Sequence, residues 1–158
     1  MLTNISVITL KGSEIEGRIP ALSKLKAASG EISSKVQEEL RKYAHENGAF
    51  FVLIQDGLTL IGYAMGRASS DIPGSFYMEE NFLLSGYEGL GLFHHFFDEM
   101  EKHATGTYSS ICFKENSGKD EGYNHAFWHK RGYIKKSASS LWIQKLGAPL
   151  EAELVEFN

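Results

Sequence analysis

The residues best suited to chemistry lie in the segment Ser85-Gly86-Tyr87-Glu88-Gly89-Leu90-Gly91. The pattern around it predicts a half-buried strand before the segment and an amphipathic helix after it, with the glycines forming a tight turn between them. Such a turn aims unpaired backbone N–H groups and the positive end of a helix at one point. This arrangement favours an anion, such as a pyrophosphate.

Two other features have the residue types for chemistry but lack the required partners. His94 and Asp98 are four residues apart, a spacing that can ligate a metal ion, but two ligands without a third are more typical of exposed helix residues. We therefore predict no metal. Cys112 lies in an apolar run and is expected in the core rather than as a nucleophile.

Charge divides the second half of the chain into two parts. Between Ala68 and Glu101 there are seven acidic residues and no lysine or arginine, whereas eight basic and three acidic residues lie from Lys102 to Leu146. If these two parts of the chain lined one cleft, one side of it would be negative and the other positive. Most of these charges are nevertheless expected on a solvated surface.

The elements that position these residues follow from periodicity and turn signals. Asp56-Gly57 favours a type I′ hairpin, Ser34 and Gln37 match a capping box, and the strand–turn–helix–strand unit implies a parallel crossover. The expected strands are Ile5–Leu10, Phe50–Ile54, Leu58–Ala64, one beginning at Phe76, Ser109–Phe113, Tyr133–Ser137 and Leu141–Lys145. The expected helices are Pro20–Ala28, Ser34–His45, Leu92–His103 and Tyr123–Arg131. The order predicts one α/β (α+β) domain over residues 1–158, with a mixed sheet and a tail over residues 147–158.

Composition narrows the classes of protein. The 158 residues are 42% apolar, enough for one core, and the sequence shows neither a membrane-spanning run nor a secretory signal. A single cysteine cannot form an internal disulfide, so we expect a reducing, cytoplasmic setting. The net charge of −4 does not favour nucleic acid or an anionic membrane as a partner.

This element order, together with the glycine turn, resembles the GNAT superfamily of acetyl-CoA-dependent N-acetyltransferases over residues 5–146. In that family the fourth strand ends in a loop, Arg/Gln-x-x-Gly-x-Gly/Ala, that holds the pyrophosphate of coenzyme A. Here the loop is Glu88-Gly89-Leu90-Gly91-Leu92-Phe93, and Phe127-Trp128-His129-Lys130-Arg131-Gly132-Tyr133 resembles the family's Phe-Tyr-x-x-x-Gly-Phe segment. The resemblance implies a central mixed, mostly antiparallel sheet of about seven strands flanked by about four helices.

The resemblance also implies a set of residues that bind acetyl-CoA. Glu88 replaces the usual Arg or Gln, Phe93 replaces a Gly or Ala, and Trp128 replaces a tyrosine that protonates the leaving thiolate in many members. An alternative register, residues 86–91, restores both glycines but loses the Arg/Gln position and shifts the match of Phe96-Phe97 to the family's Leu-Leu pair. In the preferred register the implied binding residues are Leu83, Leu84, Glu88, Gly89, Leu90, Gly91, Leu92, Phe93, Asn116 and Trp128.

The catalytic residues are likewise implied by the family. Glu79 occupies the position of the carboxylate base on the fourth strand, and its neighbour Glu80 could exchange with it through a bulge. The indole of Trp128 cannot donate the proton, so Tyr123 or His129 could replace the family's tyrosine. Exposed or core side chains remain the alternative interpretation for each of these residues.

The function expected from the resemblance is acetyl transfer from acetyl-CoA to a primary amine of a small molecule or peptide, by direct attack in a ternary complex. The acceptor would be an amine, which could be cationic, held by the acidic stretch around Asp71, Glu79 and Glu80. Two alternatives stay open. One is a catalytically impaired GNAT-like module that binds coenzyme A or has a regulatory role, and the other is an enzyme that transfers longer acyl chains. Whether the chain forms a homodimer is also open.

Overall fold

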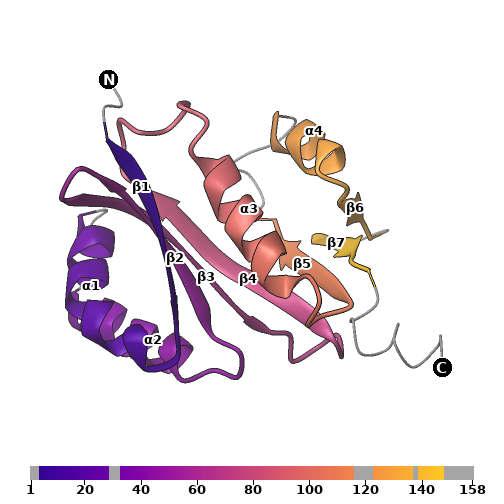
Figure 1. Ribbon diagram of the computed structural model, residues 1–158, viewed down its shortest axis with the longest axis horizontal. Helices are drawn as coiled ribbons and strands as arrows, with labels where there is room; N and C mark the ends of the chain where they lie inside the picture. Colours follow the sequence, from indigo (N-terminus) through magenta and orange to yellow (C-terminus); the bar gives the residue numbers. More distant parts are fainter. Residues whose placement is uncertain (1–3, 29–32, 116–122, 137–138, 148–158) are drawn as a thin grey trace. The chain divides into compact units, whose positions relative to one another are not determined.

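The computed structural model describes residues 4–28, 33–115, 123–136 and 139–147. Within them the elements follow the order expected from the sequence, with two additional 3-10 turns, Gly12–Glu14 and Glu16–Arg18, before the first helix (Figure 1). The α-helices are α1 (Ile19–Ala27), α2 (Ser33–Ala44), α3 (Phe93–Ala104) and α4 (Tyr123–Lys130). The strands are β1 (Ile5–Lys11), β2 (Phe50–Asp56), β3 (Thr59–Ala68), β4 (Ser75–Leu83), β5 (Ser110–Lys114), β6 (Ile134–Lys135) and β7 (Leu141–Lys145).

The strands form a seven-stranded mixed sheet in the order β1-β2-β3-β4-β5-β7-β6. β4 pairs with β5 in parallel, from Ser75 opposite Ser110 to Met78 opposite Phe113. The pairs β1–β2, β2–β3, β5–β7 and β6–β7 are antiparallel. The predicted fold class, a mostly antiparallel mixed sheet with four helices, is therefore confirmed, as is the parallel crossover through α3.

Two compact units divide the chain: Met1–Ala68 with Glu79–Met100, and Ser69–Met78 with Glu101–Asn158. In the first unit, α1 and α2 lie beside the strands β1 to β3 (Figure 1). Their apolar faces form one core with the strands, and its members include Leu22, Leu40, Phe51, Leu53 and Tyr63. This core fixes β3, on which several polar side chains of the candidate site lie.

The opposite face of β3 contacts α3 through Gly62. A Cβ atom at Gly62 would lie 2.8 Å from the carbonyl oxygen of Phe82 and 3.3 Å from Cζ of Phe96. Neighbouring residues on a strand point to opposite faces, and Tyr63 belongs to the core with α1 and α2, so α3 packs on the other face of β3. The absent side chain allows the end of β4 and the start of α3 to approach β3 closely.

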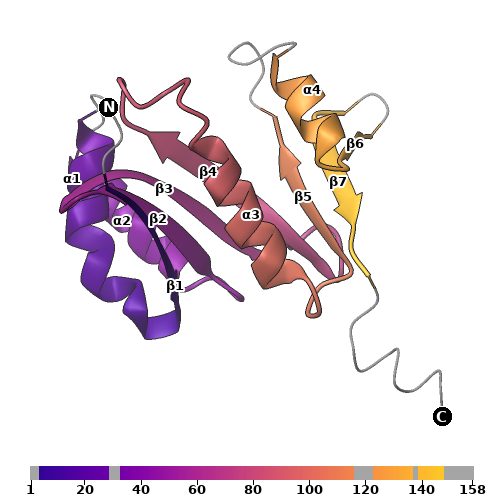
Figure 2. The same ribbon diagram turned by 45° about the horizontal axis from the view of Figure 1, so that its top comes forward.

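In the second unit, α4 lies beside β6 and β7 (Figure 2). An aromatic cluster joins them, with the Phe113 ring 4.8 Å from Trp128 and 5.1 Å from Tyr133 between ring centroids, and Trp128 5.0 Å from Trp142. The predicted hairpin of the last two strands is confirmed, but β6 comprises only Ile134–Lys135.

Some predictions fall on residues outside the described ranges. These are Asn116, Ser137 and residues 148–158, most of the expected tail. The limits of a single domain from residue 1 to 158 therefore stay a prediction.

Candidate functional site

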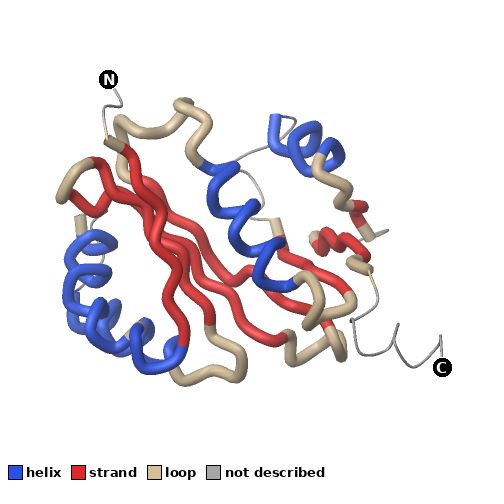
Figure 3. Tube along the Cα trace, viewed as in Figure 1, coloured by secondary structure: helices blue, strands red, loops and turns tan. Residues whose placement is uncertain are grey.

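The predicted glycine turn is the loop that joins the end of β4 to α3, drawn in tan between a red strand and a blue helix in Figure 3. Gly86, Gly89 and Gly91 have φ values of 100°, 78° and 77°. These values lie in the left-handed region, where glycine avoids the strain of a Cβ atom. The glycines therefore let the chain turn sharply from strand into helix.

The loop presents unpaired backbone donors. The N–H groups of Gly89, Gly91 and Leu92 donate no hydrogen bond to any other described residue. A Cβ atom added at Gly89 or Gly91 would meet no protein atom within 4 Å, so the backbone here is open to a ligand. Free N–H groups beside the positive end of a twelve-residue helix form a cradle for an anion.

Three contacts fix the loop on the first unit. The N–H of Leu84 donates to the carbonyl of Ile61 at 2.8 Å, and the Tyr87 hydroxyl donates to Oδ2 of Asp56 at 3.0 Å. Leu92 is 3% exposed and anchors the other end of the loop. The hydrogen bond to Asp56 raises the pKa of the Tyr87 hydroxyl, so Tyr87 stays a donor at neutral pH.

The loop forms the cradle although Glu88 and Phe93 depart from the family pattern. Their side chains and those of the neighbouring leucines lie either in solvent or against the protein. Glu88 is exposed, so its carboxylate is solvated. The Phe93 ring packs edge-on against Phe96, 5.9 Å between centroids. Leu83 is buried at the end of β4, Leu84 packs against the core, and Leu90 is 49% exposed. Eight of the predicted acetyl-CoA-binding residues, 83–84 and 88–93, thus lie along the end of β4, the loop and the first residue of α3.

Two histidines, His94 and His95, lie in the first turn of α3. Nδ1 of His94 contacts the carbonyl oxygen of Gly91, and the two imidazole rings lie 4.0 Å apart between centroids. Burial, with the neighbouring His94 next, lowers the pKa of His95. His95 is therefore a weak source of positive charge for an anion near neutral pH.

The predicted bases, Glu79 and Glu80, belong to a polar cluster in the first unit. Oε2 of Glu79 lies 3.1 Å from Nη2 of Arg67. Oε1 of Glu80 lies 2.8 Å from Nζ of Lys26, whose side chain is only 8% exposed, and the Tyr63 hydroxyl donates to Glu80 at 3.3 Å. Both carboxylates thus pair with cationic side chains, and the role of Glu79 or Glu80 as the base stays a prediction.

Tyr43 of α2 also belongs to this cluster. Its hydroxyl donates to Glu79, and burial, followed by the Glu79 carboxylate, raises its pKa. The phenol therefore stays protonated at neutral pH and acts as a donor. Lys26, Tyr43 and Arg67 were absent from the sequence-based set, because only the fold shows that three separate elements meet at β4.

In the second unit, the Trp128 side chain is buried in the aromatic cluster. It is 9% exposed and packs among aromatic rings, and the prediction that its indole does not supply the proton stays a prediction. His129 is exposed, with its ring 5.0 Å from Trp142. Tyr123 begins α4, but the placement of its side chain lies outside the described structure. The choice between Tyr123 and His129 as the acid stays open.

Two ion-pair networks stabilise the second unit. Oε2 of Glu115 lies 2.6 Å from Nε2 of His125, and its Oε1 lies 2.9 Å from Nζ of Lys135. The hydrogen bond from His125 is the largest cause of the lowered pKa of Glu115. In the other network, Arg131 and the Tyr133 hydroxyl donate to Glu101, with Arg131 Nη2 2.6 Å from Oε1.

Solved structures share this fold. A GNAT-family protein from Desulfovibrio desulfuricans has a TM-score of 0.64 and 10% identity, covering 89% of this chain and 96% of that one. An acetyltransferase from Thermus thermophilus has a TM-score of 0.69 and 11% identity, covering 92% and 99%. The ribosomal-protein-S18-alanine N-acetyltransferase of Escherichia coli has a TM-score of 0.64 and 11% identity, covering 93% and 97%.

These likenesses are of structure alone. No protein-family model matches the sequence, and no curated protein matches it. The chain has the GNAT fold, so the resemblance drawn from the sequence is confirmed at the level of the fold. Separately, no helix among the described residues has the length and apolar character needed to cross a membrane.

Proposed function

We propose that this protein is an acetyl-CoA-dependent N-acetyltransferase that acts on a primary amine of a small molecule or peptide. The observation that carries the proposal is the loop between β4 and α3 of a GNAT fold, where the N–H groups of Gly89, Gly91 and Leu92 donate to no other described residue. Other structures with this fold are acetyltransferases, including one whose name gives an alanine of a ribosomal protein as its acceptor.

The residues present fit the diphosphate of acetyl-CoA. The backbone donors do not depend on side-chain identity, and the open space at Gly89 and Gly91 allows a phosphate to approach. Because Glu88 is solvated, its repulsion is screened by water and salt. We expect weaker binding than in a loop that carries Arg or Gln at this position.

When bound, acetyl-CoA supplies a thioester acetyl group whose C–S bond breaks as the amine forms an amide, leaving the coenzyme thiol. The chain must bind the amine and accept its proton. A cationic acceptor is expected because Glu79 and Glu80 place two carboxylates on β4. It would compete with Arg67 and Lys26, which pair with them. An acceptor amine bound at Glu79 or Glu80 would transfer its proton to that carboxylate, directly or through water.

Thiol release from acetyl-CoA tests the proposal. The purified protein is assayed with a panel of primary amines: polyamines, amino acids and peptides with free N-termini, with amine-free reactions as the control. We expect release that depends on both the amine and the protein. Absence of release together with no calorimetric binding of acetyl-CoA at about 1 mM would refute the proposal.

One observation favours a second candidate, a module that binds coenzyme A without catalysis. Trp128 is packed into the aromatic cluster where many family members carry the proton donor, and both candidate bases are engaged in ion pairs. Binding of acetyl-CoA without thiol release across the whole amine panel would support this candidate. Repeating the assay with longer acyl-CoA donors distinguishes it from an enzyme for other acyl groups.

A further inference from the structure

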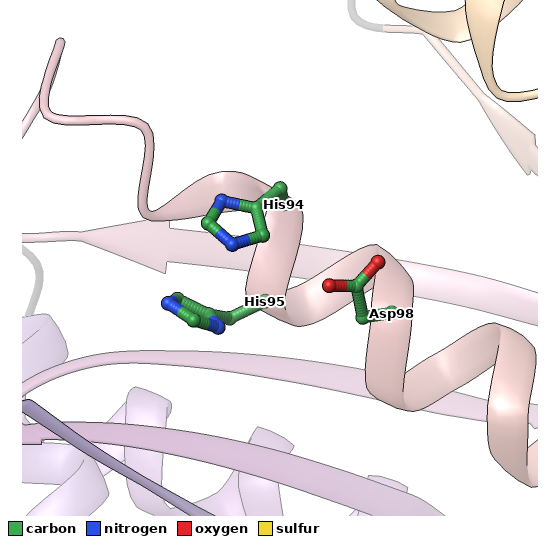
Figure 4. Close-up of side chains that lie close together, drawn as sticks. All are labelled: His94, His95 and Asp98. Atoms are coloured by element: carbon green, nitrogen blue, oxygen red, sulfur yellow. The ribbon is translucent and has the colours of Figure 1, made fainter.

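A cluster of three metal-binding side chains lies at the start of α3. One ligand atom from each of His94, His95 and Asp98 lies within 4.8 Å of the others, and Figure 4 shows the two rings beside the Asp98 carboxylate. The sequence-based prediction of no metal depended on the lack of a third ligand, and the structure supplies it as His95. We propose that these three residues form a binding site for a divalent transition-metal ion, with zinc the best match. This goes beyond acetyl transfer and does not depend on it.

Helix geometry explains why the three side chains meet. Residues three and four apart are neighbours on a helix surface, and Asp98 is four residues after His94 and three after His95. Adjacent residues do not usually share a face, but here the two imidazole rings lie 4.0 Å apart between centroids, and one ligand atom of each lies within 4.8 Å of a carboxylate oxygen of Asp98. All three ligands therefore come from less than two turns of one helix.

The separation of the ligand atoms needs only a small adjustment. Two ligands about 2.05 Å from a zinc ion at a tetrahedral angle lie about 3.4 Å apart. The observed upper limit of 4.8 Å must therefore shorten by about 1.4 Å. His94 and Asp98 are exposed, so rotation of their side chains can make this change without moving the backbone.

The hydrogen bonding of His94 suits a metal ligand. Its Nδ1 contacts the carbonyl oxygen of Gly91, and a carbonyl can only accept, so Nδ1 carries the proton. The lone pair of Nε2 is then available for a metal ion. Metal-binding histidines typically donate their other ring N–H to a carbonyl or carboxylate in this way, which fixes the tautomer and the ring orientation.

The ligand set selects the class of ion. Two imidazoles and one carboxylate suit zinc and its transition-metal neighbours, whereas calcium and magnesium prefer oxygen ligands alone. Three protein ligands leave a coordination position for water or another small ligand. The positive end of α3 opposes a cation. The Asp98 charge offsets this, and no lysine or arginine lies between Ala68 and Glu101.

Zinc binding to the untagged full-length protein tests the proposal, measured by competition with a chromogenic chelator. We expect one equivalent of Zn²⁺ to bind, and His94→Ala, His95→Ala and Asp98→Asn each to weaken the affinity at least about tenfold. The control is His45→Ala, which removes an exposed histidine outside this cluster and should leave the affinity unchanged. Circular dichroism confirms that each variant is folded.

Cobalt absorption gives a second readout that a change in stability would not imitate. Co²⁺ bound by these ligands should show visible d–d bands that each ligand variant loses and His45→Ala keeps. The proposal is overturned if the parent protein binds no Zn²⁺ at about 100 μM free ion. It is also overturned if His45→Ala weakens binding as much as the ligand variants do.

Discussion

Glu88 gives the sharpest test of where the acyl donor binds. It is an exposed carboxylate on the glycine loop, in the position where the GNAT resemblance implies Arg or Gln. If the diphosphate lies at this loop, removing the negative charge must tighten the binding of acetyl-CoA. The change needs no rearrangement, because the backbone donors of Gly89, Gly91 and Leu92 are unaffected.

The size of the effect follows from the exposure of Glu88. With a dielectric constant near 80 and a separation of about 6 Å, repulsion from two phosphate charges is about 1.4 kcal/mol without salt. Screening at a Debye length of about 8 Å reduces this to about 0.65 kcal/mol, a threefold change in the dissociation constant. Reversing the charge doubles the energy, so Glu88→Arg should tighten binding about ninefold.

Calorimetric titration with acetyl-CoA at two ionic strengths measures the effect. Glu88→Gln should tighten binding about threefold at 0.15 M salt and about sevenfold at 0.01 M. Glu38→Gln, which neutralises an exposed carboxylate on α2, should change neither value. If both Glu88 variants bind as the parent does at low salt, the diphosphate does not lie at this loop.

Three further predictions concern the packing, the ion pairs and the chemistry. Gly62→Ala should lower the free energy of unfolding by about 1–3 kcal/mol in urea titrations, because its Cβ would lie 2.8 Å from the Phe82 carbonyl oxygen. Gly17→Ala, which meets no atom within 4 Å, is the control, and equal losses would refute the packing argument. His125 and Lys135 hold Glu115 as a carboxylate, so the stability from its lowered pKa is full above the ordinary glutamate pKa and is lost as the pH falls through the lowered value. Urea unfolding across the acidic range should show this loss, and Glu115→Gln should remove it; an identical pH profile in the variant would contradict it. Glu79→Gln should lower turnover by on the order of 100-fold, most strongly at low pH where the free amine is scarce, and unchanged rates across pH would exclude Glu79 as the base.

The parts of the fold that depend on local signals could be predicted from the sequence. The β2–β3 hairpin could be predicted because Asp56-Gly57 signals a chain reversal, but the predicted turn is displaced by one residue: Asp56 pairs with Thr59, so Gly57 and Leu58 form the turn. The irregular register of that hairpin, where Ile54 pairs with Gly62 and Gln55 with Leu60, had no such signal.

The candidate site likewise has one part with a local sequence signal and another part without one. The loop from Glu88 to Phe93 could be located because its glycines and the following apolar stripe are contiguous. The pair between Lys26 and Glu80 joins residues 54 positions apart, so no local pattern indicates it. The third metal-binding residue, His95, had a usable signal in its spacing of three from Asp98, which an inspection of the i, i+4 pair alone overlooks.

Backbone amide NMR during an acetyl-CoA titration shows directly where the diphosphate binds. We expect the amide resonances of Gly89, Gly91 and Leu92 to shift most and to saturate together, because their N–H groups, which donate to no other described residue, receive the diphosphate. Saturating shifts located elsewhere, with these three amides unmoved, would contradict it.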